Sequence, residues 1–489
     1  MMRLNKCNKI LEKYRKIPSG VRASIWFAVC SILQKGIQFI VIPLFTRLLT
    51  TEQYGQFTLY QSWLNVISIF ATLNLAAGVF NNGMIKYEND RKRYISSMQG
   101  LSTIATLGVF VVYILLKEYW DKLLELPDIV VFFMFVEMLV APALSFWSAK
   151  QRFEYKYVML VFVTLAISII SPAIGLVAVL ETQEKGIARI LSASIINIGV
   201  GTVFYIYNIV KGKCFFQKDY WKFALKFNLP LIPHYLSSII LGQADRIMID
   251  SFYGKTEVAI YSLAYSMSLM MNVVTTSINA SLVPWTYQQC KKTNYKSIKK
   301  VANIILILMA GLSLVPILLA PELIGILGPA EYSDGVYLVP SISLSVFFIF
   351  LYSLFANIEF YFEKSKFIML ASIGGAILNI VLNYILLPLL GYGIAAYTTL
   401  ACYIMFSFAH YVFMKKICNE KNIKESIYNI QLIISLSILL IIISQIIMLT
   451  YKFNFIRYSI IGILLCLGVG YRKIIFDKIK LLKSFEKDT

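Results

Sequence analysis

The chain has 489 residues, of which 58% are hydrophobic and 15% are charged, and its mean hydropathy is +0.70. A soluble globular protein is about 45 to 50% apolar and about 25% charged, so this composition excludes one and predicts a protein embedded in a bilayer. The formal net charge of +20 comes without a nucleic-acid-binding motif, so we expect no nucleic-acid partner.

A helix needs about 20 mostly apolar residues to cross a hydrocarbon core of roughly 30 Å, and fourteen windows of the sequence meet this requirement. We therefore expect an all-α polytopic membrane protein with about 14 transmembrane helices. A basic leader at residues 1–21, expected at the cytoplasmic membrane surface, comes first. An amino-terminal lobe at residues 22–222 holds the windows 22–45, 56–79, 95–116, 127–148, 157–180 and 187–210. A carboxy-terminal lobe at residues 223–426 holds the windows 225–250, 258–285, 300–320, 336–360, 366–389 and 392–414. Residues 427–489 hold the last two windows, 430–450 and 456–471, and a basic cytoplasmic tail.

Lysine and arginine are distributed unevenly between the two sets of connecting loops. Of the 46 basic residues, 35 fall in the tails and loops on the side of the amino terminus, and 8 fall in the opposite loops. Because cytoplasmic loops carry the excess of positive charge, both termini are predicted to be cytoplasmic. None of the seven cysteines falls in an external loop, so neither a disulfide nor a metal site is implied.

The external connections are short, the longest having about 15 residues around the stretch PELIGILGPAEYSDGV. A polysaccharide polymerase or glycosyltransferase would usually place paired carboxylates on a larger external loop, where its chemistry needs a shaped and partly dry site. The phosphate-binding pattern G-x-x-x-x-G-K-[ST] is absent from the sequence as well. We therefore expect no catalytic residue and no cofactor, and a transporter that either uses an H+ or Na+ gradient or is passive.

Polar residues inside the predicted spans are the candidates for a transport site, because intramembrane ionisable groups usually face a bundle interior or a watery cavity. Gln34, Lys35 and Gln38 lie on one face of the first span. Lys35 is about eleven residues into that span, where a cation costs at least about 2.5 to 3.5 kcal/mol, so we predict that it holds an anionic headgroup. A buried pair with Glu137 is the structural alternative. Asn65, in the second span, is a further candidate for the same cavity.

The second half of the chain carries a similar set of polar residues. Arg246 and Asn272 are predicted to contact the substrate, whereas Asp245, Glu359 and Glu137 are the candidates for binding a coupling ion. Two interpretations of Arg246 stay open: ligand binding, or neutralisation by Asp250 one turn away. His410 is expected to be a hydrogen-bonded packing residue. For a single asparagine, an interhelical hydrogen bond of about 0.6 kcal/mol is the simpler explanation.

Two stretches of the sequence repeat the same order of features. FIVIPLFTRLLTTEQYGQFTLYQS contains Thr51-Glu52, and RIMIDSFYGKTEVAIYSLAYS contains Thr256-Glu257 at a spacing of 205 residues. In each, an apolar helix is followed by a short turn and then by an aromatic-rich helix with a polar face. This spacing fits two transporter halves of six spans each with an extra pair of spans at the carboxyl end.

These stretches, with the basic leader and the fourteen spans, resemble the polysaccharide-export, oligosaccharide-flippase branch of the multidrug/oligosaccharidyl-lipid/polysaccharide (MOP) superfamily. The resemblance implies two pseudo-symmetric six-helix lobes around a central cavity that opens to each side in turn. It implies translocation of an undecaprenyl-diphosphate-linked oligosaccharide, an O-antigen or capsule repeat unit, to the outer leaflet of the bacterial inner membrane. Polymerase and chain-length regulator proteins would be partners. Lys35 and Arg246 match the cationic lining of the family's cavity, and Asp245 matches the acidic residue before Arg on the seventh span.

Two alternatives belong to other functional classes. A drug/cation antiporter of the same superfamily would usually have twelve spans and a more acidic, aromatic cavity, so the fourteen spans and Lys35 favour the flippase. A membrane polysaccharide polymerase is disfavoured by the short external loops.

Overall fold

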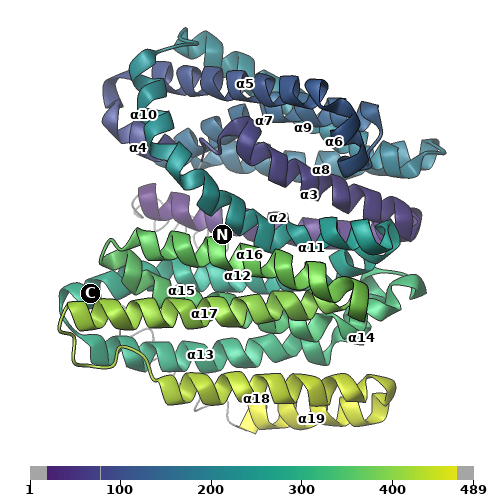
Figure 1. Ribbon diagram of the computed structural model, residues 1–489, viewed down its shortest axis with the longest axis vertical. Coiled ribbons are helices and arrows are strands. Elements are labelled where there is room, and N and C mark those ends of the chain that lie inside the picture. Colours follow the sequence, from purple (N-terminus) through teal and green to yellow (C-terminus); the bar gives the residue numbers. More distant parts are fainter. Residues whose placement is uncertain (1–18, 77–78, 471–489) are drawn as a thin grey trace, which may run out of the picture. The chain divides into compact units, whose positions relative to one another are not determined.

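The computed structural model describes residues 19–76 and 79–470, and this part of the chain consists of helices, turns and loops without a strand. The predicted leader and tail lie almost entirely outside the described residues. The first half contains α2 (Ser19–Leu48), α3 (Thr51–Thr72), α4 (Val79–Lys86), η1 (Glu88–Asp90), α5 (Arg91–Leu115), α6 (Lys117–Leu124), α7 (Asp128–Phe153), α8 (Tyr157–Glu181), α9 (Lys185–Gly212) and α10 (Lys218–Asn228). The second half contains η2 (Leu229–Leu231), α11 (Ile232–Tyr253), α12 (Lys255–Lys291), α13 (Tyr295–Leu318), α14 (Ala320–Leu327), η3 (Ala330–Tyr337), α15 (Val339–Tyr361), α16 (Ser365–Leu390), α17 (Ile394–Glu420), α18 (Ile430–Leu449), η4 (Thr450–Lys452) and α19 (Asn454–Gly470) (Figure 1).

Each of the fourteen predicted spans overlaps one long helix, which confirms the all-α polytopic class, although the window 225–250 also includes the end of α10 and η2. Among the described residues, nine helices are long and apolar enough to cross a membrane, and α12 is a tenth if its two parts form one span. α3 and α11, which carry several of the polar residues discussed above, miss that criterion, as does α17, and α19 misses it with only 17 residues. The membrane assignment of α3, α11 and α17 is supported by their place in the two halves, and that of α19 by the predicted extra pair of spans at the carboxyl end.

The chain divides into two compact units. Unit 1 comprises residues 1–49 and 60–236, and unit 2 comprises residues 50–59 and 237–489. In unit 1, α7 packs along α9, α2 packs against α8, and α10 lies on α4 and α5. An aromatic core joins the last group: Phe80 stacks on Phe146 with ring centroids 5.0 Å apart, and Tyr94 and Tyr220 complete it.

In unit 2, α15 is the central helix (Figure 1). Its sequence is mostly apolar and has no continuous polar face, and most of its residues are buried, as expected for a helix surrounded by other helices. α17, α12 and α13 pack against it, while α16 packs on α17 and α18 packs on α13. α15 and α17 in unit 2 thus form the same kind of extended helix pair as α7 and α9 in unit 1.

Two glycines, Gly254 in the turn between α11 and α12 and Gly55 at the start of α3, occupy positions that disfavour any side chain. Gly254 has a φ of +98°, a conformation that L side chains rarely adopt. Gly55, in the first turns of α3, approaches the next residue of this turn so closely that a Cβ would lie 1.8 Å from the carbonyl oxygen of Lys255. The start of α3 is held in unit 2 by this contact and by Tyr54, whose ring lies 6.2 Å from that of Tyr332.

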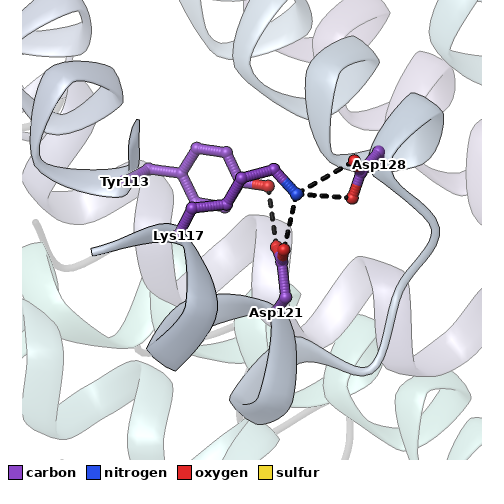
Figure 2. A network of polar contacts seen from close by, with 4 residues as sticks. All are labelled: Tyr113, Lys117, Asp121 and Asp128. Atoms are coloured by element: carbon purple, nitrogen blue, oxygen red, sulfur yellow. Dashed lines mark hydrogen bonds and ion pairs between the residues drawn. The ribbon is translucent and has the colours of Figure 1, made fainter. Parts of the chain in front are cut away.

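A polar network closes the connection between α5, α6 and α7 (Figure 2). Lys117 Nζ lies 2.5 Å from Asp121 Oδ2 and 2.9 Å from Asp128 Oδ1, and the Tyr113 hydroxyl donates to Asp121 Oδ1 at 2.9 Å. Hydrogen bonds to Asp121 and Asp128 raise the pKa of Lys117, and the bond from Lys117 lowers the pKa of Asp121. The network lies on a predicted external loop and fixes the entry into α7.

Candidate functional site

The most highly coordinated polar group in unit 2 is the carboxylate of Asp245, which is 1% exposed. Oδ1 accepts hydrogen bonds from the side-chain amides of Asn379 at 3.2 Å and Asn383 at 2.7 Å. Oδ2 accepts from the hydroxyls of Tyr261 at 2.5 Å and Thr399 at 2.6 Å. The donors come from α12, α16 and α17, so four helices converge on one carboxylate that we call the Asp245 cluster.

All four described partners of this carboxylate are neutral donors, so its hydrogen bonds bring no opposite charge to it. The cluster also holds oxygen atoms of the kind that bind hard cations: the amide oxygens of Asn379 and Asn383 and the hydroxyl of Thr399. Thr398 donates to the amide oxygen of Asn383, which extends the cluster along α17. Among the described residues no group of three or more His, Cys, Asp or Glu side chains is close enough to hold a metal ion together. A single carboxylate with neutral oxygens suits a monovalent cation.

Glu359 on α15 and His410 on α17 form a second buried polar pair in unit 2. The imidazole Nδ1 lies 2.9 Å from Glu359 Oε1, and both side chains are fully buried. The expectation that His410 is hydrogen-bonded is thus met, and its partner is one of the predicted ion-binding residues.

Glu137 on α7 is the buried carboxylate of unit 1. It accepts hydrogen bonds from the Tyr60 hydroxyl at 3.1 Å, from Ser194 Oγ at 2.7 Å and from Asn197 Nδ2 at 2.8 Å. The structural alternative for Lys35, a buried pair with Glu137, is therefore wrong, since neutral donors from α3 and α9 hold this carboxylate.

The predicted face of α2 is present. Lys35 is exposed, and its Nζ donates to Gln38 Oε1 at 3.2 Å, while Gln34 Nε2 donates to Ser168 Oγ on α8 at 3.3 Å. Lys35 has a neutral amide as its partner, and no ion pair of the described residues includes it. Its positive charge is thus not neutralised within the described part of unit 1.

Arg246 on α11 is held by neutral groups. Its guanidinium donates to Ser262 Oγ at 3.0 Å and to the carbonyl oxygen of Gly242 at 2.7 Å, and it lies over the Tyr265 ring at 4.5 Å. The alternative of neutralisation by Asp250 is wrong for this guanidinium, because Asp250 lies 4.0 Å from Lys255 Nζ instead.

The remaining candidates have less distinctive surroundings. Asn65 on α3 is exposed, and Asn272 on α12 is half-buried. Their backbone carbonyl oxygens accept from Ser68 and from Thr275. Lys35, Gln34, Gln38 and Asn65 belong to unit 1, and Arg246 and Asn272 belong to unit 2. Their contact with a substrate stays a prediction.

Sequence reasoning missed Thr399 and the pairing of Glu359 with His410. A threonine in an apolar helix normally bonds to its own helix, and the partner of Thr399 lies 154 residues away in the sequence. The i, i+4 spacing of Asn379 and Asn383 was the one local signal, since it places both amides on the same face of α16.

Comparison with known proteins gives two family matches and similar relatives. It matches the family described as "Polysaccharide biosynthesis protein" over residues 21–290 and the family described as "MatE" over residues 230–385. A Lsg locus protein of Haemophilus influenzae is 23% identical over 376 residues, which cover 73% of this chain and 88% of the relative.

Two solved structures have the same fold. The first is described as "Lipid II flippase MurJ, inward closed conformation"; it has a TM-score of 0.70, is 18% identical and covers 92% of this chain and 100% of its own. The second, an inward-facing multidrug resistance MATE family transporter of the MOP superfamily, has a TM-score of 0.60, is 13% identical and covers 82% of this chain and 100% of its own. At these identities the likeness shows the fold alone.

Proposed function

Since the chain belongs to the polysaccharide biosynthesis protein family within the MOP superfamily, we propose that it is a flippase for a lipid-linked oligosaccharide. It moves an undecaprenyl-diphosphate-linked repeat unit of an O-antigen or capsule from the inner to the outer leaflet of the bacterial cytoplasmic membrane. Both termini lie in the cytoplasm, as the lysine and arginine distribution predicts. Polymerase and chain-length regulator proteins act on the product.

The observation that carries this proposal is the state of Lys35. A cation near the middle of a span is costly, and here it is exposed on a face that it shares with Gln34 and Gln38. Its only described hydrogen bond goes to the neutral Gln38, so an anionic group can still bind it. A diphosphate linkage supplies such a group together with several acceptor oxygens. Lys35, Gln38 and Gln34 are the first contacts that we assign to it, followed by Asn65, Arg246 and Asn272.

Coupling to an ion gradient is assigned to Asp245. Its carboxylate accepts from the amides of Asn379 and Asn383. A half-turn of each amide would replace both N–H donors by carbonyl oxygens and create a ligand set for a cation. The hydroxyls of Tyr261 and Thr399 can rotate in the same way. A single negative charge among neutral oxygens favours Na+ over a divalent ion.

Transport in reconstituted proteoliposomes tests the proposal. The probe is a fluorescent undecaprenyl-diphosphate-linked oligosaccharide, and its appearance in the opposite leaflet is measured by quenching. A charge-assisted hydrogen bond contributes about 1.5 to 3 kcal/mol, so we expect Lys35→Ala to slow translocation by at least about tenfold. Lys35→Arg should retain part of the activity because it keeps the charge. Lys122→Ala, on a predicted external loop, is the matched control and should transport normally.

Full activity of Lys35→Ala at equal protein level would overturn the assignment of this residue. The accumulation of cytoplasm-facing lipid-linked repeat units in a deletion strain tests the function itself. If chain elongation were lost while translocation remained normal, the protein would be a polymerase.

A second candidate function is export of drugs in exchange for cations. It is favoured by the MatE match over residues 230–385 and by the MATE transporter folds. Uptake of a cationic dye by the same proteoliposomes, with no movement of the lipid-linked probe, would support the antiporter and refute the flippase.

A further inference from the structure

The pair of Glu359 and His410 joins α15 and α17, which pack along each other in unit 2. Both side chains are fully buried, and Nδ1 and Oε1 are 2.9 Å apart. α15 ends two residues after Glu359, at Tyr361, and the connecting turn brings Lys364 to within 3.0 Å of Glu420 at the end of α17. The pair therefore lies near the end of the bundle that faces the predicted cytoplasmic loops.

Each partner has one polar atom left over. Glu359 Oε2 and His410 Nε2 have no hydrogen-bond partner among the described residues. The imidazole is enclosed by rings: Tyr352 stacks on it with centroids 5.4 Å apart, and Phe406 meets it edge-on at 4.6 Å. Aromatic rings supply no counter-charge. A charge on Glu359 or His410 can therefore be balanced only by the other member of the pair.

The other titratable side chains around this end of unit 2 are mostly neutral. They include Tyr352 and Tyr361 on α15, Tyr287 and Cys290 on α12, Tyr295 on α13, Tyr411, Cys418 and Glu420 on α17 with the exposed Lys415 and Lys416, Glu363 and Lys364 in the turn before α16, and Tyr428 before α18. The other charged members, Glu363 and the paired Lys364 and Glu420, are at least partly exposed. None of the hydrogen bonds between described side chains connects these groups to Glu359 or His410.

The number of protons on the pair decides its net charge. With one proton on the imidazole and none on the carboxyl group, the buried pair carries a charge of −1. A second proton, taken from water onto either group, forms one N–H or O–H bond and makes the pair neutral. Burying an uncompensated charge is much more costly than burying a neutral hydrogen-bonded pair. Uptake of that proton is therefore favourable, and its release is the step that leaves a charge between α15 and α17.

We propose that Glu359 and His410 together form a proton-binding site, separate from the Asp245 cluster, that holds one exchangeable proton. The separation follows from α17, which carries both Thr399 and His410. These residues are eleven positions apart, which corresponds to about 16 Å along a helix. The two sites share no hydrogen-bonding atom. Proton binding itself does not depend on the proposed function, and only its use in transport does.

The chain offers a direct test because it contains only two histidines. His234→Gln leaves His410 as the single imidazole, which can be labelled with ¹⁵N-histidine in lipid nanodiscs and followed by NMR from pH 5 to pH 9. We expect its nitrogen resonances to change with pH in His234→Gln. In His234→Gln/Glu359→Gln they should stay at the positions of a neutral imidazole throughout, because the counter-charge has been removed.

Resonances that do not change with pH, or that change identically in both variants, would overturn the proposal. A proton titration provides a second readout for variants of lower yield. The parent should release about one more proton per chain over this pH range than Glu359→Gln/His410→Asn. Equal release would contradict the site.

Transport measurements then separate the two proposals. If the proton is used, His410→Asn should flatten the pH dependence of translocation while Lys35 variants keep it. A chain that binds the proton but moves no lipid-linked probe would refute the flippase and leave the proton site standing.

Discussion

Removal of the Asp245 charge is the perturbation that best separates an ion site from a structural hydrogen-bond cluster. Asp245→Asn keeps the size of the side chain and all four neighbours. The new amide oxygen can accept from Asn379 and Asn383, and the hydroxyls of Tyr261 and Thr399 can rotate to accept from the new N–H groups. The variant should fold, whereas its cation site has lost its only negative charge.

Asp245→Ala shows how much depends on the cluster. It leaves four buried donors without an acceptor, and each unsatisfied donor costs about 1 to 3 kcal/mol, or about 4 to 12 kcal/mol in all. A loss of this size is comparable with the whole stability of a typical domain, about 5 to 15 kcal/mol. We therefore expect Asp245→Ala to accumulate poorly, and Asp245→Asn is the variant to purify.

The assay is thermal unfolding in detergent, in which NaCl replaces choline chloride at constant ionic strength. At a sodium concentration of about 100 times Kd, binding adds about 2.7 kcal/mol of stability. An unfolding entropy of about 2.1 cal/mol/K per residue amounts to about 1 kcal/mol/K for 489 residues, so the parent Tm should rise by about 3 °C. Asp245→Asn should shift by less than about 1 °C under the same conditions.

The matched control is Asp250→Asn, which removes a carboxylate one turn further along α11 that lies beside Lys255. It should keep the full sodium response. A parent protein whose Tm does not respond to sodium would refute sodium binding. An equal response in the parent and in Asp245→Asn would place the ion elsewhere.

Three further variants test the packing and the surface network. Gly55→Ala places a Cβ 1.8 Å from the Lys255 carbonyl oxygen and should destabilise the protein by about 1 to 3 kcal/mol or more. Its control is Gly108→Ala, where a Cβ meets nothing within 4 Å and the substitution should be neutral or stabilising. Equal Tm values for the two variants would contradict the close contact at Gly55. Tyr60→Phe removes a hydrogen bond to Glu137 and one to Ser194 and should lower the free energy of unfolding by about 1 to 3 kcal/mol, measured by thermal unfolding. Tyr458→Phe, which removes a hydroxyl at an exposed position, is the control. An unchanged Tm of Tyr60→Phe would show that water replaces the hydroxyl. In the network of Figure 2, the pKa of Asp121 is lowered and that of Lys117 is raised, so the stabilisation from the ion pair is lost as pH falls below about 3.9 or rises above about 10.4. The difference in Tm between the parent and Lys117→Met should therefore stay constant from pH 5 to pH 9. A difference that varied within this window would contradict the assignment.

The sequence was sufficient to predict the helices because a bilayer leaves few choices. An apolar window of about 20 residues has to satisfy its backbone internally, so it forms a helix. α3 and α11 have a lower hydropathy because of their polar faces, and their position in the repeat supports the apolar windows that predicted them. Sequence pattern alone therefore determined where the helices lie.

The partners of buried polar residues could not be predicted in the same way. Spacing along a helix gives neighbours at i+3 and i+4, which is why Asp250 was considered as a partner for Arg246. The structure shows that Arg246 is held by Ser262 from the next helix, and that Glu359 binds His410, 51 residues away. These contacts depend on which helices pack together. The periodicity of a single helix does not predict its neighbouring helices.

The buried carboxylates differ in what their surroundings allow them to bind. Asp245 accepts hydrogen bonds from four neutral donors, and Glu137 accepts them from three. Glu359 has a single partner, and that partner is itself titratable.

Glu137 and Glu359 occupy the fourth span of their respective halves, and each is bonded to the sixth span, α9 or α17. In unit 1 the sixth span supplies a hydroxyl and an amide, which can neither take nor give a proton near neutral pH, whereas in unit 2 it supplies an imidazole, which can. The two halves thus share a helix arrangement but not its chemistry. Of these two described contacts between a fourth and a sixth span, the one in unit 2 is therefore the contact that brings a carboxyl group and an imidazole together.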